Sequence, residues 1–169
     1  MKNYFLLFFI GISSCIFSQE IFYVTAPSGL VVRNNPNGTR FGKISYGSSV
    51  KVEKKLQSFS IMDNGMVING NWVKIDGNNS QIQYDENLTS GVDNNKVYAF
   101  NGFLTPKNEF INQNEKNIAK YSALKDYYLA TSYDVFAIKG DFFGDGIEDD
   151  LYRMIDPNGK VRLMIINHQ

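Results

Sequence analysis

Acidic side chains concentrate in one stretch near the C-terminal end of the sequence, GDFFGDGIEDD, residues 140 to 150. Within it, aspartates recur at every fourth position, and Gly146 occupies the place where a calcium-binding loop turns sharply. Calcium takes about six to eight oxygen ligands, which such a loop supplies from carboxylates and from a backbone carbonyl. The pattern therefore predicts a calcium site formed by Asp141, Asp145, Ile147 and Asp149.

One position of this loop departs from the usual pattern. Phe143 stands where an Asn or Asp normally supplies a side-chain oxygen, so the expected site is weakened, with water as the substitute ligand. The stretch resembles the Gly-Asp-Phe-Asn-Gly-Asp-Gly loops of FG-GAP and EF-hand-like calcium repeats, in a single copy. The resemblance implies calcium as a cofactor. The alternative is an acidic turn with solvated carboxylates, whose mutual repulsion costs little at physiological salt.

Residues for other catalytic chemistry are scarce. The sequence has one histidine, His168, next to the last residue, and one cysteine, Cys15, in an apolar N-terminal run. Ser–His and Cys–His catalysis need an internal, oriented imidazole, and zinc sites need several His or Cys ligands. We therefore expect no enzyme. A carboxylate-based hydrolase is an outside case, because it requires only two carboxylates, but one of them must lie in a cleft that raises its pKa.

The N-terminus, MKNYFLLFFIGISSCIFSQE, has one lysine, an apolar run and then small polar residues. This is typical of a secretory signal peptide, expected at residues 1–19 with cleavage after Ser18 or Gln19. The alternative is lipidation at Cys15, because residues 12–15 resemble a bacterial lipobox, and only then would the protein attach to the membrane. We expect an exported protein, periplasmic or extracellular.

Charge gives no indication of a nucleic-acid partner. Lysine plus arginine equals aspartate plus glutamate, at 17 residues each. A balanced chain has no overall field that would draw it to a polyanion.

Residues 21–104 alternate short β-rich segments with turn residues. IFYV, GLVVR and WVKI predict strands, and Val50 and Val52 show the period of two. Turns are expected at NNPNGT, at DNG (63–65) and at NGN (69–71). Several short strands at close spacing predict a small barrel or sandwich.

Four of these segments resemble a known family. Gly29–Pro36, with the sequence GLVVRNNP, resembles the Leu-x-Val-Arg-x-x-Pro signature that opens bacterial SH3-like domains. The segments 44–52, 71–75 and 97–104 are similar to later strands of that family. The resemblance implies an SH3-like barrel over residues 20–105 and an exported, non-enzymatic module of the cell envelope that binds peptidoglycan peptide or glycan.

Two features depart from the family pattern. Asn95-Lys96-Val97 replaces the usual Gly-aromatic-Val, and the polar segment 77–95 is longer than the pattern needs. Polar loops of this length are often functional.

Aromatic side chains in or beside these segments are the candidate ligand contacts. Flat aromatic faces stack on sugar rings or pack against peptides, although a small barrel also needs large residues for its core. Arg33 has two possible roles, pairing with a ligand carboxylate or fixing the next turn by hydrogen bonds to carbonyls, and we favour the second. The candidate aromatic residues are Tyr23, Tyr46, Trp72, Tyr98 and Phe100.

Residues 106–169 have a different character. Apolar residues from Asn114 to Leu129 fall near helical spacing, a strand is expected from Asp134, and a hairpin is expected to turn through residues 156–159. The whole chain is thus expected to be mainly β, a small barrel followed by an α+β unit of one helix and about three antiparallel strands. The alternative function is a calcium-dependent surface module that binds an envelope protein through the 141–149 loop.

Overall fold

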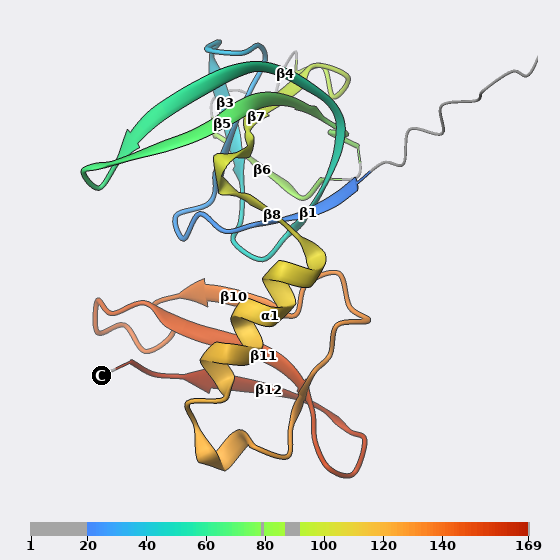
Figure 1. Cartoon of the computed structure of the whole chain (residues 1–169), viewed down its shortest axis with the longest axis vertical. Helices are drawn as coiled ribbons and strands as arrows, with labels where there is room; N and C mark the ends of the chain where they lie inside the picture. The colour runs from blue at the N-terminus through green and yellow to red at the C-terminus, as the bar shows by residue number, and fades with distance from the viewer. Residues whose placement is uncertain (1–19, 79, 87–91, 169) are drawn as a thin grey trace, which may run out of the picture.

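The computed structural model describes residues 20–78, 80–86 and 92–168. The predicted signal peptide and Cys15 lie outside the described residues. The chain is mainly β, as predicted, and forms two antiparallel sheets with one α-helix, α1 (Lys107–Ile118) (Figure 1). Among the described helices, none is long and apolar enough to cross a membrane.

The larger sheet has eight strands and is strongly curled (Figure 1). Its order is β6-β3-β2-β7-β5-β4-β1-β8, and its interior is filled by aliphatic residues such as Val32, Ile44, Val73 and Ile75. The strands are β1 (Glu20–Val24), β2 (Leu30–Arg33), β3 (Arg40–Ile44), β4 (Ser49–Asp63), β5 (Met66–Ile75), β6 (Ile82–Tyr84), β7 (Val97–Phe100) and β8 (Leu104–Pro106).

A long hairpin of β4 and β5 extends from this sheet (Figure 1). Asn64 and Gly65 both have positive φ, at 47° and 78°, as the two central residues of a type I′ turn require, so the DNG turn is confirmed. The turn predicted at Asn69–Asn71 is wrong. These residues lie inside β5 and pair with Ser58–Ser60 of β4, because the tight turn at 64–65 already sets the register of the ladder.

The helix lies earlier than predicted. Its buried face carries Phe110, Asn114 and Ile118 at intervals of four residues, and it ends at Ile118 rather than near Leu129. Beyond it, Tyr121 and Leu124 continue from Ile118 at intervals of three, which suits the short 3₁₀ helix η2 (Ser122–Leu124). The apolar spacing from Asn114 onward therefore comes from two different elements, α1 and η2, and not from one helix.

The smaller sheet contains β10 (Ala137–Gly140), β11 (Asp149–Ile155) and β12 (Val161–Ile166), and the two-residue β9 (Tyr128–Leu129) pairs with β11. The predicted hairpin through residues 156–159 is confirmed, with Gly159 at φ 77°. The predicted strand from Asp134 begins only at Ala137. Helix α1 covers one face of this sheet (Figure 1).

One buried cluster joins the two sheets. Phe110 of α1 stacks on Tyr23 of β1 with ring centroids 4.9 Å apart, and it also contacts Tyr46 and Phe136. The cluster continues to Tyr152 and Met154 of the smaller sheet. Apolar packing therefore extends across residues 105 and 106, where the sequence places a domain boundary, and the division into units 20–105 and 106–169 stays a prediction.

Candidate functional site

Trp72 and Phe100 form the centre of the candidate site. They lie directly opposite each other on β5 and β7. Their neighbours Val73 and Ala99 belong to the aliphatic core, and since side chains alternate along a strand, Trp72 and Phe100 occupy the other face of the sheet. Two of the five predicted aromatic residues are thus brought together outside the aliphatic core.

Two further aromatic rings complete this group. Phe59 of β4 lies 5.3 Å from the Trp72 ring and 5.9 Å from the Phe100 ring, between centroids. Phe103 lies 6.1 Å from Phe100 at a steep angle. Phe59 and Phe103 both meet Phe100 edge-to-face, an arrangement that aromatic quadrupoles favour, and Phe59 is tilted against Trp72. We call Phe59, Trp72, Phe100 and Phe103 the aromatic cluster.

The aromatic cluster forms the wall of a pocket of about 490 Å³. This volume is within the range of small-molecule sites, which are mostly apolar with a few polar groups. The 26–31 segment forms another wall, and Asp63, at the far end of β4, adds a carboxylate. The full lining is Ala26, Pro27, Ser28, Gly29, Leu30, Val31, Arg33, Asn37, Phe59, Ile61, Asp63, Trp72, Phe100 and Phe103.

Trp72, which lines this pocket, carries an unsatisfied donor. Its side chain is 4% exposed, and its indole Nε1–H is buried without an acceptor among the described residues. A buried indole N–H normally has a partner, because leaving it without one costs about 1–3 kcal/mol. An acceptor oxygen brought by a ligand would remove this cost.

Arg33 has the structural role that we favoured. Its Nη1 donates a hydrogen bond of 2.7 Å to the carbonyl oxygen of Gly38. The bond closes the turn between β2 and β3, so Arg33 lines the pocket with one of its donors already used.

The other three predicted aromatic residues lie elsewhere. Tyr23 and Tyr46 are buried in the cluster beneath α1, and burial raises the pKa of both hydroxyl groups. Tyr98 is half-buried on β7, opposite Lys74 and Arg33 rather than in the pocket. The structure thus does not bring the five aromatic residues together as one surface.

Sequence reasoning missed the contribution of β4. Phe59, Ile61 and Asp63 line the pocket from alternate positions of this strand. The period of two was the available signal, but the polar residues between them and two register shifts in the β4–β5 pairing obscure a 15-residue strand.

The acidic loop connects β10 to β11, and its first aspartate holds the loop in shape. Asp141 Oδ1 accepts hydrogen bonds from the N–H groups of Gly144 and Asp145, and its Oδ2 accepts one from Gly146. Asp145 Oδ1 accepts a bond from the N–H of Ile147 at 2.9 Å. These carboxylates therefore cap the backbone of the loop.

Asp149 is the buried carboxylate of this loop. It is 0% exposed; its Oδ2 accepts a bond from the N–H of Phe142, and its Oδ1 has no partner among the described residues. Within the described ranges, no three His, Cys, Asp or Glu side chains converge closely enough to hold a metal ion. As arranged here, the predicted ligands Asp141, Asp145, Ile147 and Asp149 do not form a complete calcium shell.

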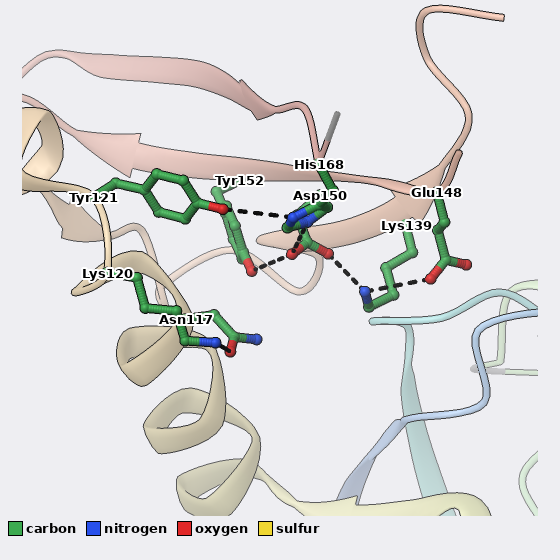
Figure 2. A network of polar contacts seen from close by, with 8 residues as sticks. All are labelled: Asn117, Lys120, Tyr121, Lys139, Glu148, Asp150, Tyr152 and His168. Carbon is green, nitrogen blue, oxygen red and sulfur yellow. Dashed lines mark hydrogen bonds and ion pairs between the residues drawn. The ribbon is translucent and has the colours of Figure 1, made fainter. Parts of the chain in front are cut away.

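A polar network lies beside this loop (Figure 2). Buried Asp150 bonds to Lys139 Nζ at 2.8 Å, to His168 Nε2 at 3.1 Å and to the Tyr152 hydroxyl at 3.1 Å. Burial opposes ionisation of Asp150, but the bonds from Lys139 and the other donors outweigh it and hold its pKa below the usual value. The network links His168, which follows β12, to side chains of β10 and β11. His168 is therefore held against the smaller sheet.

Comparisons with known proteins give no relative. The chain matches no family model, and searches against curated proteins and solved structures found no significant similarity.

Proposed function

We propose that the protein is an exported, non-enzymatic binding module of the bacterial cell envelope, in which an SH3-like barrel recognises peptidoglycan peptide or glycan. The observation that carries the proposal is that Trp72, which lines an aromatic pocket, has a buried Nε1–H with no acceptor among the described residues. Wall peptides and glycans are rich in carbonyl, carboxylate and hydroxyl oxygens that accept such a bond.

The rest of the pocket suits the same ligands. Phe59 and Phe100 make the pocket wall apolar, which suits a sugar ring or an aliphatic side chain. Asp63 offers a carboxylate for the amino groups of wall peptides. The strongly curled antiparallel sheet and the GLVVRNNP segment at β2 also support an SH3-like barrel.

Removing the indole donor is expected to weaken wall binding. In Trp72→Phe an aromatic ring remains but the N–H is lost, and the loss of one hydrogen bond to a ligand costs about 1.4 kcal/mol, or tenfold in affinity. The measurement is co-sedimentation of the purified mature protein with insoluble peptidoglycan across a concentration series.

The control for this experiment is Tyr128→Phe, a change at an exposed ring on β9 far from the pocket in the chain. It should leave wall binding unchanged. Phe59→Leu serves as a second pocket variant in case Trp72→Phe loses its fold, which thermal melting detects. If all three variants bind as the wild type does, the pocket is not the wall-binding site, and if the wild type does not bind, the proposed function is wrong.

The second candidate function is a calcium-dependent module that binds an envelope protein through the 141–149 loop. The fully buried Oδ1 of Asp149 favours it, since this oxygen has no partner in the part of the chain that the structure describes; an unpaired buried carboxylate oxygen is costly, and a cation would compensate. In this account the loop closes around the ion, and the carboxylates of Asp141 and Asp145 become ligands.

Calcium at about 10 mM is then expected to raise the melting temperature of the wild type by a few degrees, because a ligand of about 10⁻³ M affinity at that concentration stabilises the fold by about 1.4 kcal/mol. Asp145→Ala should abolish this shift, while Glu115→Gln, an exposed change on α1, should preserve it. If calcium leaves the melting temperature of the wild type unchanged, the proposed calcium site is wrong. Wall binding that persists when a chelator removes calcium would be assigned to the pocket and not to this loop.

A further inference from the structure

Strand β12 has an open edge that no described strand covers. The two edge strands of the larger sheet, β6 and β8, are short, at three residues each, which is one way in which proteins protect sheet edges. Strand β12 has six residues, without proline or bulge, and its one charged side chain is Arg162. Such an edge is a template for another strand.

Hydrogen bonds inside the sheet show which groups of β12 point to this edge. The N–H of Arg153 donates to Phe136 and its carbonyl accepts from Ala130, so both groups point away from β12. Leu163 lies opposite Arg153. In an antiparallel ladder, residues facing each other either both turn inward or both turn outward, so the N–H and C=O of Leu163 point to the open edge, as do those of Val161 and Ile165.

The side chains of the same three residues are exposed. Leu163 is 63% exposed, and Val161 and Ile165 are 45% exposed each. Ile165, Leu151 and Ile138 form one row across the three strands, on the face opposite to α1. The open edge therefore adjoins an apolar sheet face.

We propose that β12 pairs with β12 of a second copy, antiparallel about a two-fold axis at Leu163. In this register Leu163 faces Leu163 of the second copy, and Val161 faces Ile165, so each outward-turned N–H and C=O finds a partner. Apolar side chains also face each other on the exposed side. The interface is separate from the aromatic pocket and does not depend on the proposed function.

Charge permits a second copy as the partner and favours this register. The guanidinium of Arg162 is already held by Asp156 at 3.0 Å, and in the proposed register it faces Met164 of the second copy. A register centred on Arg162 would instead place two arginines opposite each other, which is destabilising. Centring on Leu163 uses all three outward-turned residues and brings no like charges together.

Oligomeric state and cross-linking test this proposal. The mature protein should show a concentration-dependent monomer–dimer equilibrium by analytical ultracentrifugation. Leu163→Lys, which places two cations face to face, should weaken the dimer by about tenfold or more. Val67→Lys is the matched control at an exposed apolar residue of β5 and should leave the dimer intact.

Single-cysteine variants test the register, since the sequence has no cysteine after Cys15. Leu163→Cys should form covalent dimers with a short bismaleimide. Val161→Cys alone should not, because the two thiols would lie roughly 14 Å apart along the strands, but it should cross-link when mixed with Ile165→Cys. A protein that stays monomeric at all concentrations overturns the proposal. A monomer that instead captures a foreign strand peptide also overturns it, as does equal cross-linking through residue 161.

Discussion

Replacing Phe110 by alanine is expected to lower the free energy of unfolding by about 4 kcal/mol, within the range for phenylalanine truncation in a core. Phe110 is 0% exposed, and its ring contacts those of Tyr23, Tyr46 and Phe136. The truncation would open a cavity where α1 meets both sheets. Chemical denaturation monitored by circular dichroism measures the effect.

Phe143→Ala is the control for this change. The same side chain is removed, but from a loop position where it is 57% exposed, so the expected effect is within about 0.5 kcal/mol. A loss below about 1 kcal/mol for Phe110→Ala would contradict the shared core. Separate unfolding transitions for the two sheets in the wild type would contradict it as well.

Gly47→Ala is expected to cost about 3 kcal/mol. Gly47 lies in the turn between β3 and β4 with φ at 75°, where a side chain costs about 1–2 kcal/mol. A Cβ there would also fall on the carbonyl oxygen of Ala137, far inside van der Waals contact. The backbones of β10 and of this turn would have to separate, which adds about 1–3 kcal/mol of overpacking.

Gly65→Ala separates the two contributions to this cost. Gly65 has nearly the same φ, at 78°, but a Cβ there meets no atom within 4 Å. It should therefore lose only the conformational part, about 1–2 kcal/mol. Equal losses in denaturation experiments on the two variants would show that the turn and β10 are not in close contact.

Local signals explain which parts of the fold were predictable. Alternation of apolar and polar residues predicts the strands around Val32 and Ile75, and turn residues predict the turns at 63–65 and 156–159. Both signals act over a few positions. The start of α1 was missed because Phe110, its most buried residue, belongs to a core that includes Tyr23 and Tyr46. Such packing depends on tertiary contacts between distant segments.

The candidate site shows the same limit. Trp72 and Phe100 were predictable as aromatic residues of strands, but their pairing depends on the β5–β7 register. Phe59 joins them because the β4–β5 hairpin brings it onto the same face. No spacing in the sequence indicates that the Trp72 N–H lacks an acceptor within the described ranges, since that property belongs to the folded structure.

Two pockets on one dimer would matter for a polymeric ligand. A cell wall repeats its peptides and glycans, so a β12-linked dimer would bind two of them at once if their spacing allows. The second contact then becomes intramolecular and raises the overall affinity without any new interaction at either pocket.

The most direct test of the central proposal uses the single tryptophan of the chain. Its indole N–H gives one side-chain signal in a ¹H–¹⁵N correlation spectrum of the protein. On titration with soluble peptidoglycan fragments, we predict a large downfield proton shift of this signal that saturates with binding, as Nε1–H gains an acceptor. Binding that leaves the indole signal unmoved, or no binding at all, would contradict a wall ligand in the Trp72 pocket.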